Sequence, residues 1–343
     1  MDLCLALLAC GLLLRQADRL HHAHNRPHAA PARELLALQR RRASTLTPVL
    51  LLAGQWIQIA GWWLLAGHGP LAAAVAALAV AVHFRHLQEV SHFAVHGVLA
   101  RTPRANLLLG EAGAHLPLAL APLPLRRRSH VRDHHPNATM ATDPNLDDLH
   151  RAGLRPGATR TTVAWALIHP LTPRGLYATA TAIAAVLRRS PARAAALAAT
   201  ATLAVLIGGI PALIWGLLLP RLLLYPQLAW MSLINEHTWF DPETRTGSAA
   251  DIEAGRCLRL YPRNRALAAI AATTWLPYGD LHHYAHSAHP GLRWNYLRAA
   301  ERHLPPPHFT PAGLLLGSPS VIRRHHQALT ASPARIGQPA PTA

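Results

Sequence analysis

The amino-acid sequence predicts an all-α integral membrane protein with two transmembrane helical hairpins, about four spans, and a cytoplasmic helical cap that holds a histidine-rich site for two metal ions. Three observations support this fold class. Apolar stretches long enough to cross a bilayer form two blocks, arginines lie at the ends of apolar runs, and histidines gather in separated clusters. The chain is 51% hydrophobic despite a formal net charge of +17. Because the arginines border apolar runs instead of forming one basic face, no nucleic-acid partner is expected.

Residues 1–47 are expected to form an apolar start followed by a polar segment. The first 14 residues are apolar but lack a basic leading region and a small-residue cleavage site, so we expect them to remain uncleaved. The next segment is rich in histidine and arginine. Its cluster of His21, His22, His24 and His28 offers metal ligands, although a solvated segment between two membrane-near elements is the favoured interpretation.

The first predicted hairpin begins at Pro48. The stretch from Pro48 to Gly67 has about twenty residues, enough to cross roughly 30 Å of hydrocarbon. A Gly-His-Gly-Pro turn leads into the apolar stretch Leu71 to Phe84, which continues as a helix with polar side chains. Arg40, Arg41 and Arg42 precede the first span, so the N-terminal side is predicted to be cytoplasmic.

The second apolar block extends from Ala194 to Leu233. Its length of about forty residues suits two spans and therefore a second hairpin. The sequence leaves two places open for the break between these spans: Gly208, Gly209 and Pro211, or Pro220 and Arg221.

Other segments are expected near the membrane surface or in the cap. Arg101 to Leu125 is interrupted by prolines and could lie along the surface, and Arg151 to Arg193 reads as cytoplasmic or interfacial helices. We expect the membrane domain to cover residues 48–304. Residues 305–343 form a C-terminal tail that is predicted to be partly disordered, from Ser332 onward.

Histidines in four separate segments are the strongest chemical signal in the chain. All of these segments fall on the cytoplasmic side if the chain forms two hairpins. Eight or more imidazoles exceed what one ion uses, so two metal ions are predicted, and neutral imidazole suits iron, zinc and copper. Taken alone, His92 and His96 could be interfacial histidines with satisfied hydrogen bonds, and His237 a helix cap. The histidines are His92 and His96; His130, His134 and His135; His237; and His282, His283, His286 and His289.

The helical period sets the expected directions of these side chains. On an α-helix, positions i and i+4 share a face, so His130 and His134 should point the same way, with His135 about 100° round. By the same argument His282, His286 and His289 form one stripe. Cys4, Cys10 and Cys257 have no metal-ligand spacing, so histidine and carboxylate would have to bind any metal.

These motifs resemble those of the membrane fatty acid desaturase family, the histidine-box di-iron enzymes. The resemblance covers roughly Pro48 to Leu304. The first box is His92-Phe-Ala-Val-His96, and the second is Ser129 to His135, followed by Asp-Pro-Asn where the family often has Asp-Pro-Asp, with Asn145 at the changed position. The pair Glu236-His237 matches the family's Glu-His after the last span and implies His237 as an extra ligand.

The third box departs from the family pattern. Members usually have H-x-x-H-H there, and the alignment places His283 and His286 at the first two histidines and Ser287 at the third. Whether His282 or His289 compensates, or one iron has altered coordination, is left open by the sequence.

The resemblance implies two iron ions and O2 as co-substrate, acting on an unactivated C–H bond. No catalytic residue is expected beyond the metal centre. The implied ligands are His92, His96, His130, His134, His135, His237, His282, His283 and His286. The acidic side chains expected to orient them are Glu89, Asp143, Asp147 and Glu236, with Asp133 as a further candidate.

Three functions compete, and the first two follow from this resemblance. The first is a desaturase that introduces a C=C bond into an acyl chain on a lipid or an acyl carrier. The second is a hydroxylase or other oxygenase on the same scaffold, with an alkyl, carotenoid or specialised-metabolite substrate. The third, from another class, is a non-enzymatic His-rich membrane metal-binding protein. For the enzymes, no fused electron carrier is visible, so a separate ferredoxin or flavoprotein reductase is implied. The expected location is the bacterial plasma membrane, with the metal site facing the cytoplasm.

Overall fold

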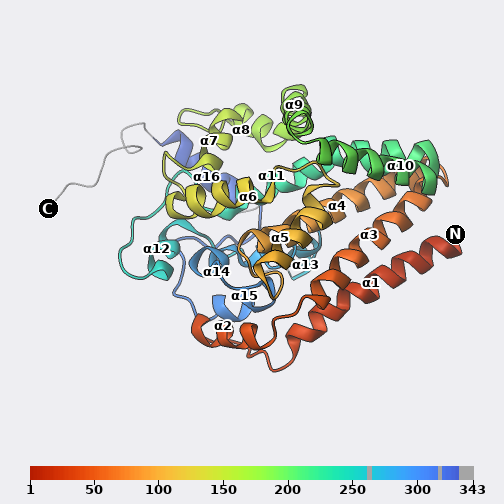
Figure 1. Ribbon diagram of the computed structural model, residues 1–343. Coiled ribbons are helices and arrows are strands. Elements are labelled where there is room, and N and C mark those ends of the chain that lie inside the picture. The colour runs from red at the N-terminus through yellow and green to blue at the C-terminus, as the bar shows by residue number, and fades with distance from the viewer. Residues whose placement is uncertain (261–264, 316–318, 332–343) are drawn as a thin grey trace.

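The computed structural model describes residues 1–260, 265–315 and 319–331, and within them the chain is helical without any β-strand (Figure 1). The all-α prediction is therefore confirmed for this part of the chain. Among these residues, three helical segments are long and apolar enough to cross a membrane: Leu46–Ala66, Pro70–Val95 and Pro191–Glu236. The third segment has 46 residues and contains the whole second apolar block.

The first hairpin consists of α3 (Leu46–Ala66) and α4 (Pro70–Val95). Gly69 turns the chain with a φ of 115°, a backbone conformation that side chains other than glycine rarely adopt. Pro70 follows at the start of α4, where a missing amide donor costs nothing. Because α4 continues beyond its apolar half to Val95, it connects the hairpin tip directly to the first histidine box.

The N-terminal helix α1 (Asp2–Ala23) packs along α3 with one face, which buries Cys4 and Gly11, whereas Leu3, Leu5 and Leu13 remain exposed. The helices touch through small residues: a Cβ atom on Gly11 would lie 2.5 Å from the carbonyl oxygen of Gly54. The interpretation of the following segment as solvated is wrong for His22, which is buried with its Nδ1 3.0 Å from the Tyr296 hydroxyl. The short helix α2 (Ala32–Arg41) follows.

The second apolar segment is made of α10 (Pro191–Leu213), the π-helices η5 (Ile214–Leu218) and η6 (Pro220–Leu224), and α11 (Tyr225–Glu236). Its helical backbone breaks at Gly208 and Gly209. Of the two positions that the sequence left open, the structure therefore uses the glycine pair. The break lies against the backbone of Trp63, near the tip of the first hairpin, and the chain then returns along α4.

Shorter helices lie mainly toward the end of the first hairpin that is away from Gly69; in Figure 1 most of them are on the left, with α9 at the top. They are α5 (Pro103–Gly110), η1 (Glu111–His115), α6 (Leu123–Arg127), η2 (Arg128–His134), η3 (His135–Asn137), α7 (Pro144–Arg151), α8 (Arg160–Leu167), η4 (His169–Leu171), α9 (Pro173–Arg189), α12 (Ala249–Arg256), α13 (Arg265–Thr273), η7 (Asp280–His282), α14 (His283–Ala288), α15 (Trp294–Glu301) and α16 (Val321–Thr330).

The expected C-terminal tail contains structure. Helix α16 buries Val321 and His325, and the His325 Nε2 lies 3.0 Å from the carbonyl oxygen of Ile234 at the end of α11. The segment from Ser332 onward, for which disorder is expected, lies outside the described residues.

Candidate metal centre

Five histidines from three separate parts of the chain bring ring nitrogens to within 4.8 Å of one another. Two come from the end of α4, two from η2 and the residue after it, and one from α14. We call these residues the first histidine group: His92, His96, His130, His135 and His286.

The nitrogens of the first histidine group face one another. The Nδ1 atom of His92 lies 2.8 Å from the Glu89 carboxylate, to which it donates its hydrogen, so the Nε2 atom of His92 carries a lone pair. This Nε2 lies 2.6 Å from the Nε2 of His130 and 3.1 Å from that of His96. A metal ion bound to imidazole nitrogens at about 2.1 Å would place neighbouring ligands about 3 Å apart. The spacing therefore fits a bound cation.

A second histidine group consists of His134, His237 and His283. The Nε2 atoms of all three are buried and have no hydrogen-bond partner among the described residues. Each Nδ1 has a side-chain partner: in the same order, they are Asp143 at 3.0 Å, Cys257 Sγ at 3.3 Å and Asp280 at 3.3 Å. A histidine that donates from Nδ1 presents a lone pair on Nε2, which is the usual arrangement of a metal ligand. The donor set thus fits a second metal ion.

The second histidine box differs from its expected geometry. Residues Arg128–His134 form the π-helix η2, in which hydrogen bonds join residues i and i+5 rather than i and i+4. The rings of His130 and His134 still stack, with centroids 5.3 Å apart, as expected of side chains that point the same way. His130 and His135 belong to the first group, whereas His134 belongs to the second.

Two expected members lie outside both groups. The Nδ1 of His282 lies 3.1 Å from the carboxylate of Glu301, because η7 points this side chain toward α15. Asp147 is exposed and forms an ion pair with Arg151, one turn further along α7. Ser287 is buried beside these groups in α14, and its hydroxyl has no hydrogen-bond partner in the described structure.

The Asp-Pro-Asn motif explains how His134 is held. Asp143 is the N-cap of α7 and accepts hydrogen bonds from the amides of Asn145 at 2.9 Å and Thr139 at 3.1 Å. The same carboxylate accepts from His134, so one fully buried side chain both starts a helix and orients an imidazole.

Sequence reasoning missed three residues of the site. Asp280 accepts a hydrogen bond from His283, and Arg85 donates to both Asp280 at 2.6 Å and Glu89 at 2.9 Å. Arg85 thereby connects the carboxylates that support the two groups. Cys257, excluded because it lacks metal-ligand spacing, lies against His237. A single cysteine distant from every box gives no sequence signal for such a role.

Burial keeps most of these imidazoles neutral. Removal from water lowers the pKa of His96, His130, His237 and His286 well below the usual value, and neighbouring imidazoles lower it further. His283 behaves differently: burial alone would lower its pKa, but the carboxylates of Glu236 and Asp280 outweigh burial and raise it. Neutral imidazole is the form that binds metal.

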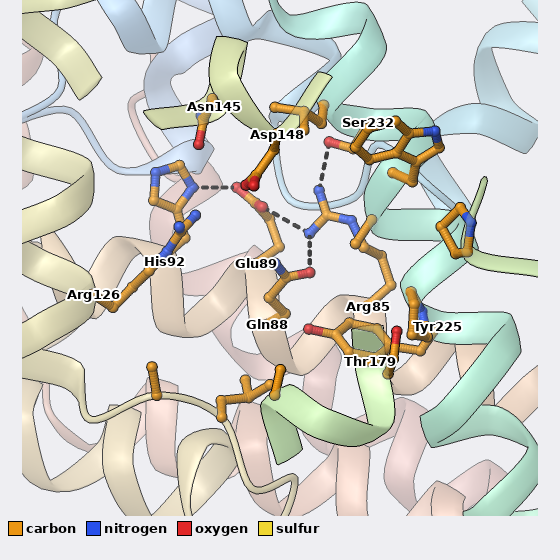
Figure 2. Close-up of a pocket in the computed structure, with 18 of the residues that line it drawn as sticks. Arg85, Gln88, Glu89, His92, Arg126, Asn145, Asp148, Thr179, Tyr225 and Ser232 are labelled. Atoms are coloured by element: carbon orange, nitrogen blue, oxygen red, sulfur yellow. Dashed lines mark hydrogen bonds and ion pairs between the residues drawn. The ribbon is translucent and has the colours of Figure 1, made fainter. Parts of the chain in front are cut away.

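A cavity of about 710 Å³ adjoins both histidine groups. Its wall includes His92 and His130 of the first group and His283 of the second, together with residues of α4, α9 and α11. Figure 2 shows Arg85 at this wall, bonded to Gln88, Glu89 and Ser232. Small and apolar residues of α9, among them Ala178 and Ile183, line the other side. The cavity is large enough for a chain-like organic molecule next to the imidazoles.

The sequence model of the family described as "Fatty acid desaturase" matches residues 68–317, which is more than half of the chain. The chain belongs to the fatty acid desaturase family. Comparisons with individual curated proteins and with solved structures gave no match. The predicted resemblance is therefore confirmed at the level of the family.

Family membership gives the site a chemical context. Fatty acid desaturases are metal-dependent, and the family suggests an oxidoreductase that acts in a membrane on lipid. The apolar helices and the grouped imidazoles agree with this context.

Proposed function

We propose that this member of the fatty acid desaturase family is a membrane di-iron enzyme that uses O2 to introduce a C=C bond into an acyl chain. The observation that carries the proposal is the presence of two histidine groups, with inward-facing nitrogens, beside one cavity. Iron would be held by His92, His96, His130, His135 and His286 at one position and by His134, His237 and His283 at the other. His282 is not included, because it is directed to Glu301.

Bound iron would supply the redox chemistry that activates O2, and the protein's residues prepare the site for it. Glu89, Asp143 and Asp280 accept hydrogen bonds from the Nδ1 atoms of His92, His134 and His283, which fixes the direction of the three Nε2 atoms. The wall formed by α9 would position the substrate chain and exclude water from the reacting carbon.

The cavity also contains unpaired positive charge. Arg126 and Arg174 line it and make no ion pair among the described residues. Both would attract an acyl substrate that carries an anionic group, such as a carboxylate or a phosphate-bearing carrier.

The same proposal includes the orientation of the protein in the membrane and its source of electrons. Two hairpins with four crossings would place the histidine groups on the cytoplasmic side of a bacterial plasma membrane, because arginines precede the first span. From there, a ferredoxin or a flavoprotein reductase would deliver electrons to the iron.

A hydroxylase or other oxygenase is the second candidate, and the cavity wall favours it specifically. Beside the imidazoles the lining includes Gln88, Ser232 and the ion pair of Arg85 with Glu89, which are polar for a surface that contacts a plain hydrocarbon chain. A substrate with a polar group near the reacting carbon would fit this wall better.

Product analysis separates the two candidates. Lipids and small metabolites are profiled in a desaturase-deficient bacterial host that expresses either this chain or its His134→Ala variant. New unsaturated acyl chains that disappear in the variant establish desaturation, and oxygenated products establish the oxygenase. A purified protein that contains no iron would exclude both enzymes. Iron or zinc bound without O2 consumption on reduction would support a non-enzymatic metal-binding protein.

A further inference from the structure

The two histidine groups are unequal in their number of imidazoles. The first group has five, whereas the second has three. The position where the family usually has another histidine is Ser287, and a neutral serine hydroxyl is a weak ligand for iron. The second metal ion therefore needs a donor from elsewhere in the chain.

Glu236 is placed to supply that donor. Its carboxylate lies within 4.8 Å of ring nitrogens of His134 and His237 and, in another group, within 4.8 Å of His283 and Asp280. Glu236 is the last residue of α11, directly before His237, so the helix end fixes it beside the second histidine group. It also forms part of the cavity wall.

Glu236 differs from the neighbouring carboxylates in its partners. The neighbouring carboxylates of Glu89 and Asp280 form ion pairs with Arg85, and Asp143 accepts hydrogen bonds from an imidazole and two amides. Glu236 forms no ion pair among the described residues, and it accepts a long hydrogen bond of 3.5 Å from the Ser232 hydroxyl. A half-buried carboxylate that has no arginine partner is costly unless a cation balances its charge.

We propose that Glu236 is a direct ligand of the second metal ion and takes the place of the histidine that Ser287 replaces. This inference rests on the proposed two-iron function. The second ion would then have three imidazole nitrogens and a carboxylate oxygen, a mixed donor set that suits non-haem iron, while the first would have imidazoles alone. The two iron ions would differ in charge environment, with the anionic ligand facing the cavity.

The test measures metal binding rather than activity. The protein is freed of metal in lipid nanodiscs and titrated with Fe²⁺ without oxygen, alongside Glu236→Gln and the control Glu243→Gln. Glu243 is an exposed carboxylate paired with Arg245, so the control makes the same chemical change away from the site. Wild type and control should bind two ions. Glu236→Gln should bind one ion normally and the second at least about 100-fold more weakly, because loss of a supporting residue alone costs about 10–100-fold.

An infrared difference spectrum recorded on Fe²⁺ addition tests the bond itself. A metal-dependent shift of a carboxylate stretch should appear in the wild type and the control and be absent in Glu236→Gln. Equal affinity for both ions in Glu236→Gln, with the shift retained, would overturn the inference and leave the two-iron function standing. A wild type that binds no iron would overturn both.

A third variant covers the case in which Glu236→Gln loses both ions. Glu236→Asp keeps the carboxylate on a shorter side chain. Recovery of iron binding in Glu236→Asp supports ligation by the carboxylate. Equal loss in the Gln and Asp variants would contradict the inference, since the position would then tolerate no change whatever its charge.

Discussion

Individual residues next to the imidazoles decide how each ring is oriented. His134 and His283 donate to carboxylates, but His237 faces a thiol, and Cys257 lies 3.4 Å from the carboxylate of Glu253 behind it. Burial, together with the nearby Glu253 charge, raises the pKa of Cys257 well above the usual value, so the sulfur keeps its hydrogen and donates it to Glu253. The thiol thereby connects the Glu253 carboxylate to the Nδ1 atom of His237 through two hydrogen bonds.

This connection makes a prediction at the residue scale. Cys257→Ala should weaken binding of the second Fe²⁺ by about 10–100-fold, the usual effect of removing a partner of a metal-bound histidine. Cys257→Ser, which retains a hydroxyl that can accept from Nδ1 and donate to Glu253, should recover most of the affinity. Anaerobic Fe²⁺ titration measures both.

Cys4→Ala is the matched control for losing a buried thiol. Cys4 is buried and donates to the carbonyl oxygen of Gly61, far along the sequence from the histidine boxes. Equal Fe²⁺ affinities in Cys257→Ala and Cys4→Ala would show that Cys257 does not position His237.

The helices bring the residues of the metal centre together by packing closely and by breaking at glycines. The tip of the first hairpin meets the break in the second apolar segment where Gly208 lies against Trp63: a Cβ atom added to Gly208 would clash with the Trp63 carbonyl oxygen. No side chain fits there. By contrast, a Cβ atom on Gly67, at the end of α3, would meet its nearest atoms at 3.6 Å, an ordinary contact.

At the element scale, Gly208→Ala should therefore destabilise the protein and Gly67→Ala should not. Crowding of this kind typically costs about 1–3 kcal/mol, and here the contact is with rigid backbone. Gly67 has a φ of −75°, which alanine adopts easily. Thermal unfolding in detergent, followed by tryptophan fluorescence, compares the two variants. Similar melting temperatures for both would show that the two apolar segments do not pack closely at this point.

Hydropathy and histidine spacing predicted the first hairpin and the family. They could not predict the local backbone geometry of the second box or the contacts between segments distant in sequence. The apolar period identifies α3 and the start of α4, and box spacing identifies His92 and His96. His130 and His134 belong to different ligand groups within the π-helix η2, and no pattern of polarity or charge in this segment predicts a π-helix. The contacts of Asp280 and Cys257 join segments distant in sequence, and a single sequence contains no record of such pairs.

The whole molecule surrounds a cluster of neutral imidazoles with apolar helices. This arrangement couples stability to pH in the metal-free protein. Burial and neighbouring imidazoles lower the pKa of His135 to about 2, and the pKa values of His96, His130 and His286 also fall well below 6.5. These rings are neutral when folded and take up protons when unfolded, so each makes folding less favourable as pH decreases below about 6.5.

The metal-free protein should therefore lose thermal stability between pH 7 and pH 5. His283 opposes this trend: its pKa is raised, so its contribution to stability is present at low pH and lost as pH rises through the folded value. It is one group against at least four with lowered pKa values.

Bound Fe²⁺ should raise the melting temperature at pH 7, since a ligand that binds only the folded state stabilises it. On acidification this gain should decrease, because protons compete for the same ring nitrogens. Differential scanning calorimetry at both pH values, with and without Fe²⁺, measures each effect. A melting temperature of the metal-free protein that does not change with pH would mean that the imidazoles already have ordinary pKa values and lie in contact with water.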